Sequence, residues 1–183
     1  MSAFRIHTVE SAPAASRQSL ETLQKNFGLI PNLAATMAES PTLVNGFVGA
    51  FVNFSGGTFS AAERQVLLLT NAVTNRSEWA VAFHSTAALK EGVDAADVLA
   101  IRDGRTVSTP RLNALSTLSR RCIELRGKLA DNDIAAFTNA GFTHAQILEV
   151  MAGNALSTMA NYAGNITHPP LEAPFKAQEW KSN

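Results

Sequence analysis

The sequence predicts an all-α fold, and three observations lead to this prediction. Helix start signals, in which a capping side chain or a proline precedes an apolar run, recur along the 183 residues with short gaps between them. Leu112, Leu115, Leu118 and Cys122 form one apolar stripe at helical spacing. Only Val66–Thr70 resembles a buried strand, and this run has helical flanks and follows a capping box. We therefore expect a multi-helix bundle.

The first half of the chain supplies four expected helices. Each begins at a serine or proline signal, and glycines such as Gly28 and Gly56 end the first and third of them. The expected segments are Ala14–Asn26, a short helix from Pro31, a helix from Ser40-Pro41 to about Phe54, and Ala61–Thr74. Ser60 and Glu63 have the spacing of a capping box at the last of these.

The second half continues the same pattern. Asn75 is the expected N-cap of a helix that runs to Glu91, with Glu78 as its capping carboxylate. The later expected helices are a short one from Asp94 to Gly104, Arg111–Leu129 after Thr109-Pro110, Asn132–Asn139 capped by Asp131, and a last one from Thr143 to about Tyr162. The expected architecture is a single domain spanning residues 1–183, with an irregular tail from about residue 166 that lies over the surface.

Composition excludes several classes of function. Lys+Arg and Asp+Glu both number 15, and no basic run interleaved with aromatic residues is present, so nucleic acid is not an expected partner. The apolar runs are too interrupted to span a bilayer, and we expect a cytoplasmic protein without a signal peptide. Metal-ligand spacings are lacking, so no metal is expected. No other cofactor is expected. The single cysteine, Cys122, excludes intramolecular two-thiol redox chemistry.

The segment from Asn75 to His84 is the one that could carry chemistry. With Asn75 as N-cap, Ser77 occupies the second helical position, where free backbone N–H groups and the helix dipole favour a developing anion. Ser77, Ala80 and His84 then share one helix face. Glu63 and Gln65 on the preceding helix point in different directions, so at most one of them is expected to face this site.

This segment resembles the signature of the alkylhydroperoxidase D-like and carboxymuconolactone decarboxylase superfamily, in which a helix carries Asn-x-Cys-x-Tyr-Cys-x-x-x-His and a glutamate lies on the preceding helix. Asn75 and His84 match this pattern, whereas Trp79 stands in place of the tyrosine. Further segments resemble the longer, peroxidase-related branch of the superfamily, so the resemblance covers nearly the whole chain: 27–32, 40–41, 60–64, 84–92 and 161–171. It implies the helical bundle of this superfamily and a homo-oligomer, either a trimer or a hexamer.

The resemblance also shows where the chemistry departs from the family. Its thiol-dependent members reduce peroxides with the two cysteines and move protons with the histidine and glutamate. Ser77 and Ala80 occupy the places of the cysteines, and Gln65 occupies that of the glutamate. A hydroxyl cannot form a sulfenate or a disulfide. Cys122 lies on an apolar stripe, where a thiol is typically buried and inert.

A small-molecule pocket is the remaining expectation around His84. The small side chain of Ala80 should leave a void beside it, and Trp79 and Phe83 are expected to form apolar walls. Glu63 is expected near this pocket, where it also serves as a capping carboxylate. Ser77 and His84 are about 10 Å apart along the axis of an ideal helix, so only a water or a ligand could bridge them.

Three functions remain open from the sequence. The first is a family member that binds a small molecule but has lost thiol peroxidase activity. The second, implied by the decarboxylase branch, is a cofactor-free decarboxylase or isomerase. His84 would be its general acid/base, and Ser77 and Gln65 would donate hydrogen bonds to an oxyanion. The third is residual peroxidase, and therefore oxidoreductase, activity by another route.

Overall fold

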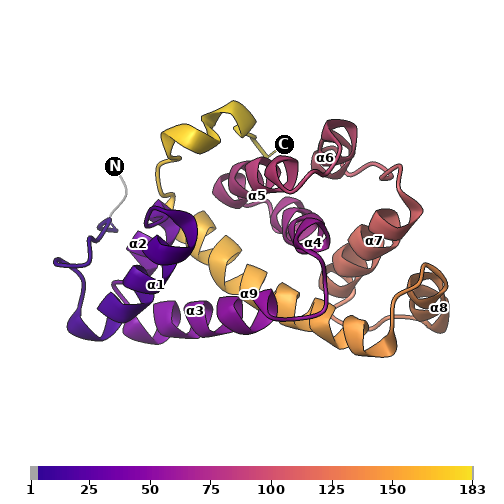
Figure 1. Cartoon of the computed structure of the whole chain (residues 1–183), viewed down its shortest axis with the longest axis horizontal. Helices are drawn as coiled ribbons and strands as arrows, with labels where there is room; N and C mark the ends of the chain where they lie inside the picture. The colour runs from indigo at the N-terminus through magenta and orange to yellow at the C-terminus, as the bar shows by residue number, and fades with distance from the viewer. Residues whose placement is uncertain (1–3, 183) are drawn as a thin grey trace.

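The computed structural model describes residues 4–182, which form nine α-helices, two short 3-10 helices and no β-strand (Figure 1). The α-helices are α1 (Arg17–Phe27), α2 (Asn32–Met37), α3 (Pro41–Ser55), α4 (Ala61–Thr74), α5 (Glu78–Lys90), α6 (Ala95–Arg102), α7 (Pro110–Glu124), α8 (Asp131–Asn139) and α9 (His144–Thr167). The 3-10 helices are η1 (Ala14–Ser16) and η2 (Ala173–Gln178). The predicted all-α fold is therefore confirmed.

Helix α4 forms the centre of the bundle. It packs against α5, α7 and α9, and Figure 1 shows it between these helices. Every residue from 66 to 72 is buried, because helices cover α4 on several sides. A helix that is covered on several sides has no exposed polar face, so its sequence does not alternate between apolar and polar residues with a helical period. This explains why Val66–Thr70 resembles a strand in the sequence although it is helical.

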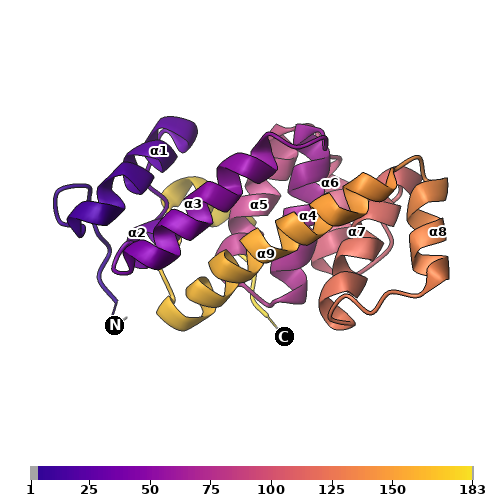
Figure 2. The ribbon, with the colours of Figure 1, turned by 90° about the horizontal axis from the view of Figure 1, so that it is seen from below.

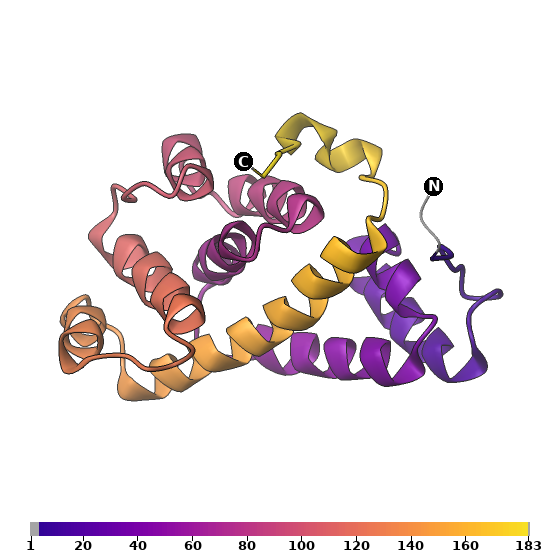
Figure 3. The ribbon, with the colours of Figure 1, turned by 180° about the vertical axis from the view of Figure 1, so that it is seen from behind.

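Helix α9 crosses the length of the molecule (Figure 3), and α3 lies beside it (Figure 2). The close approach of α9 to the core depends on Gly153. A Cβ atom at this position would lie 2.6 Å from Leu67 Cδ2 and 3.0 Å from the Phe54 ring. Only a residue without a side chain can therefore occupy this crossing without displacing its neighbours.

The outward face of α9 is apolar. Leu148, Tyr162 and Ile166 are 71%, 53% and 65% exposed, and no residue from 150 to 167 carries a charge. A long uncharged face suits contact with a second copy of the chain. The homo-oligomer, as a trimer or hexamer, stays a prediction.

The C-terminal helices end differently from the prediction. Helix α7 ends at Glu124 instead of Leu129, because Arg126 (φ 54°) and Gly127 (φ 78°) adopt left-handed conformations and the Gly127 N–H donates to the Cys122 carbonyl at 2.8 Å. Helix α9 instead continues past Tyr162 to Thr167.

Helix α8 begins one residue earlier than predicted. Asp131 is its first residue, not its cap, and Asp133 accepts a hydrogen bond from the Ala130 N–H at 3.0 Å. Beyond α9, the chain runs over α5 and forms η2, whose Phe175 is buried. Within residues 4–182, none of the helices is long and apolar enough to cross a membrane.

Candidate functional site

The turn between α4 and α5 places the motif residues. The N-cap of α5 is Ser77, and Asn75 is instead the residue at the end of α4. The prediction of Asn75 as N-cap, with Ser77 inside the helix, is therefore wrong. The cause is Arg76, which adopts a left-handed conformation (φ 53°). This turn of the backbone allows the Ser77 N–H to donate a hydrogen bond to the Ala72 carbonyl at 2.9 Å. This is the hydrogen-bond pattern that ends a helix, and it usually contains glycine.

Ser77 does not lie at the predicted pocket. Its Oγ is fully buried and has no hydrogen-bond partner among the described residues, not even the backbone of its own helix. A Cβ atom on Gly164 of α9 would lie 3.3 Å from this oxygen, so the hydroxyl faces α9 at close range. The expected grouping of Ser77 with Ala80 and His84 around one void is therefore not observed. Its hydroxyl is not placed to donate to a ligand beside His84.

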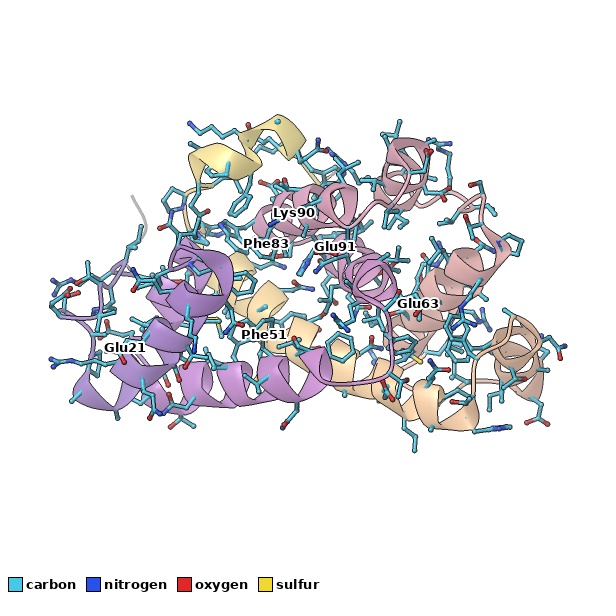
Figure 4. All side chains as sticks on the ribbon, viewed as in Figure 1. Glu21, Phe51, Glu63, Phe83, Lys90 and Glu91 are labelled. Atoms are coloured by element: carbon cyan, nitrogen blue, oxygen red, sulfur yellow. The ribbon has the colours of Figure 1, made fainter. Side chains whose placement is uncertain are left out.

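Glu63 also lies away from the pocket, contrary to the prediction, but its capping role is confirmed. Its carboxylate accepts from the Ser60 N–H at 2.9 Å, and its other oxygen accepts from Arg111 Nε at 2.7 Å. Burial would raise the pKa of Glu63, but the Ser60 N–H and the Arg111 guanidinium outweigh it and hold the pKa below its ordinary value. Figure 4 shows Glu63 on the side of α4 that faces α7, away from Phe83 and Phe51.

Glu78 does not cap α5. Because the helix begins one residue after Ser77, Glu78 occupies the first helical position and not the third. Its carboxylate accepts from Lys181 Nζ at 2.8 Å and so holds the end of the C-terminal tail against the start of α5.

His84 and Gln65 form the polar centre of the candidate site. His84 Nδ1 lies 2.9 Å from Gln65 Oε1, so Nδ1 carries a proton that it donates and Nε2 keeps a free lone pair. Surrounding apolar atoms disfavour the imidazolium and lower the pKa of His84 to about 3. The histidine is therefore neutral at pH 7. Gln65 orients the ring as a glutamate would, but it neither ionises nor relays protons.

A cavity of about 70 Å³ lies next to this pair. Predicted pocket residues Ala80, Trp79 and Phe83 line it together with His84 and Gln65. Helices α1, α2, α3 and α9 complete the lining, so six helices contribute to it. Phe47 and Phe51 lie on one face of α3 and form part of the cavity wall.

The aromatic side chains of the cavity form one connected group. Phe83 stacks on Trp79 with ring centroids 5.2 Å apart and meets Phe27 edge-on at 5.5 Å. Phe27 in turn lies 5.2 Å from Phe51. Figure 4 shows Phe51 and Phe83 on facing helices, α3 and α5. These contacts make the walls rigid and apolar, as is typical of small-molecule sites.

Glu172 in the C-terminal tail also shapes the cavity wall, although it is not among the predicted site residues. Its Oε2 accepts from Trp79 Nε1 at 2.9 Å, and its Oε1 accepts from the Asn32 N–H at the start of α2 at 2.6 Å. Phe175 follows in η2 and meets Phe83 edge-on at 5.0 Å. The tail therefore fixes two parts of the cavity wall. No spacing in the sequence indicates these contacts, because 140 residues separate Glu172 from Asn32.

A buried polar network supports the cavity on the side of α9. Asn71 Nδ2 donates to Asn154 Oδ1 at 2.9 Å and to Ser157 Oγ at 3.0 Å, while Asn71 Oδ1 accepts from Ser119 at 2.6 Å. Ser157 also lines the cavity. Three helices, α4, α7 and α9, are joined by these bonds. Local spacing in the sequence does not indicate this network, because its members are far apart in the chain.

Replacing Gln65 by glutamate is expected to raise the pKa of His84 by about 2 pH units. A carboxylate at hydrogen-bond distance stabilises the imidazolium, and such charges typically move a pKa by about 1 to 3 units. NMR titration of the His84 ring carbons measures the effect, with Gln65→Met as the uncharged control. An unchanged pKa in Gln65→Glu would show that residue 65 does not face His84 in solution.

The lowered pKa of His84 also predicts how stability depends on pH. In the unfolded chain His84 binds a proton near pH 6.5, whereas in the folded chain it stays neutral down to about pH 3. The free energy of unfolding therefore falls as the pH falls below 6.5. Between pH 7.5 and 5.0, we expect the wild type to lose about 2 kcal/mol more unfolding free energy than His84→Gln does. Urea denaturation at both pH values gives this difference. Equal losses in the two proteins would contradict a buried neutral His84.

Comparisons with known proteins give the same fold. A profile of the carboxymuconolactone decarboxylase family matches residues 39–118, which include α3 to α6 and part of α7. The alkylhydroperoxidase AhpD core of a peroxidase-related protein from Ralstonia eutropha JMP134 is similar at a TM-score of 0.84 and 17% identity, over 95% of this chain and 94% of that one. A peroxidase-related protein from Silicibacter sp. TM1040 is similar at a TM-score of 0.78 and 15% identity, over 97% of this chain and 95% of that one.

The apo structure of the debrominase Bmp8 is also similar, at a TM-score of 0.75 and 15% identity over 96% of this chain and 95% of that one. No curated protein sequence matches the chain. At such low identities the solved structures establish the shared fold, and the profile match covers the helices that carry Gln65 and His84. Residues 39–118 therefore match the carboxymuconolactone decarboxylase family, and the chain shares the fold of the alkylhydroperoxidase AhpD core.

Proposed function

We propose that this protein binds a small molecule in the cavity beside His84 and has no thiol peroxidase activity. The observation that carries the proposal is the cavity itself, which combines aromatic walls with an oriented, neutral imidazole. Apolar concave sites with a few fixed polar groups are the usual sites of small ligands. The debrominase Bmp8 has been crystallised, as a cysteine-to-alanine variant, with 2,3,4-tribromopyrrole. The aromatic walls here suit a planar ring as well, but the cavity volume of about 70 Å³ suits a smaller one.

The environment of Cys122 supports the loss of peroxidase chemistry. The thiol is 3% exposed on α7, and burial raises its pKa, so it is protonated at neutral pH. Cys122 does not line the cavity. A peroxide bound beside His84 would therefore meet an alanine at position 80 and no thiolate.

The decarboxylase or isomerase alternative receives less support. A general base is most effective when its pKa is near the working pH, and a pKa of about 3 makes His84 a weak base at pH 7. Ser77, the expected oxyanion donor, lies outside the cavity. Turnover of a lactone or a β-keto acid that is lost in His84→Gln would nevertheless establish this alternative against the proposal.

A thermal-shift screen of small molecules tests binding. Ligands are expected to raise the melting temperature of the wild type, since they bind only the folded state. This increase should vanish in Ala80→Leu or Ala160→Leu, which fill the cavity from α5 and α9. Ala96→Leu, at an exposed position of α6, is the matched control and should keep the increase.

A peroxidase assay tests the second half of the proposal. With an organic hydroperoxide and a dithiol reductant, we expect no turnover above the uncatalysed rate. Turnover that disappears in Cys122→Ser would overturn the proposal, as would a screen that yields no ligand sensitive to Ala80→Leu.

A further inference from the structure

The lining of the cavity is uncharged. Among the described residues that surround it, Gln65, His84 and Ser157 are the polar ones, and none is an arginine, lysine, aspartate or glutamate. The two carboxylates of neighbouring segments are engaged elsewhere, Glu63 with Arg111 and Glu172 with Trp79. A charged ligand would lose its hydration here without gaining a counter-ion, which is costly.

The polar groups of the lining favour a ligand that donates a hydrogen bond. Gln65 Oε1 already accepts from His84, and Ser157 Oγ already accepts from Asn71. His84 Nε2 is therefore the side-chain acceptor of the lining that has no hydrogen bond to a described residue. The Gln65 amide N–H groups can meet an acceptor atom, but an amide carries no charge that would compensate an anion. Because His84 stays neutral well below pH 7, it does not compensate an anion either.

The size and shape of the cavity restrict the ligand further. Its volume is about 70 Å³, whereas an engineered protein cavity that takes up benzene measures about 150 Å³. Trp79 and Phe83, stacked with an interplanar angle of 15°, form one wall, and flat rings pack well against such a surface.

From this lining we infer that the cavity selects small, uncharged, planar rings that donate one hydrogen bond to His84 Nε2, and that it rejects anions and cations of the same size. The inference rests on the proposed function, because it names the class of ligand for the same site.

Four five-membered rings of nearly equal size test it at pH 7.5: pyrrole, a neutral N–H donor; furan, neutral without a donor; tetrazolate, an anion; and pyrrolidinium, a cation. Ligand-detected NMR gives the dissociation constants for the full-length protein. Pyrrole is expected to bind most tightly, furan at least fivefold more weakly, and the two charged rings at least tenfold more weakly. In His84→Leu, the advantage of pyrrole over furan should disappear.

The wild-type series decides the matter even if His84→Leu fails to fold. Equal or tighter binding of furan, tetrazolate or pyrrolidinium would overturn the inference. If no ring binds but the thermal-shift screen yields another ligand that Ala80→Leu abolishes, the inference fails and the proposed function stands. If neither experiment yields a ligand, both fail.

Discussion

Replacing Asn71 by alanine is expected to lower the free energy of unfolding by about 3 to 4 kcal/mol, because it leaves several buried polar groups without a hydrogen-bond partner. Asn71 is fully buried, and its side chain bonds to Asn154, Ser157 and Ser119 on two other helices. Each buried group left without a partner costs about 1 to 3 kcal/mol. Chemical denaturation followed by circular dichroism measures the loss.

Asn75→Ala is the matched control for this prediction. Asn75 lies at the end of the same helix, and its buried Nδ2 has no hydrogen-bond partner among the described residues. Its replacement should cost less than about 1 kcal/mol, since no such bond is lost. Equal losses in the two variants would show that the network contributes little to stability.

Gly153→Val is expected to destabilise the protein by about 3 kcal/mol or to prevent folding. A Cβ atom there would lie 2.6 Å from Leu67 Cδ2, and both Leu67 and the neighbouring Phe54 are buried and cannot move aside without displacing others. Overpacking of this kind typically costs about 1 to 3 kcal/mol, and the second branch of valine adds to the overlap. Thermal and urea denaturation measure the change.

Gly49→Ala serves as the comparison for this second prediction. Gly49 lies in α3, and no atom lies within 4 Å of the position that a Cβ atom would take there. Alanine should therefore raise stability by about 0.5 to 1 kcal/mol through its higher helix propensity. If Gly153→Val were as stable as the wild type, α9 could not approach α4 as closely as described.

The sequence predicts most helix starts, and two of the helix boundaries that it misses involve the same kind of residue. Ser60 and Thr143 cap α4 and α9 as expected, because their side chains bond to the helix within three residues. The start of α5 and the end of α7 differ from the prediction because the left-handed residue at each boundary is an arginine, Arg76 and Arg126. Glycine would have marked the position of Arg76, whereas arginine has no such tendency. At the end of α7, Gly127 follows Arg126 directly and is left-handed as well.

The candidate site could be predicted only as far as local spacing reaches. Ala80, Phe83 and His84 follow from the motif and the helical period, and they line the cavity. Ser77 lies elsewhere because an error of two residues at a helix start turns a side chain to another face. The contributions of α1, α2 and α9 depend on tertiary packing, which short spacings do not encode.

The two hydrogen bonds of Glu172 have a consequence for how this cavity can diverge among related proteins. The tail residue holds Trp79 of α5 and the start of α2, but it belongs to no α-helix itself. A substitution of Glu172 can therefore move Trp79, and with it one wall of the cavity, without changing any residue of the lining itself. A residue outside the α-helices can in this way affect ligand preference, although six helices supply nearly all of the lining.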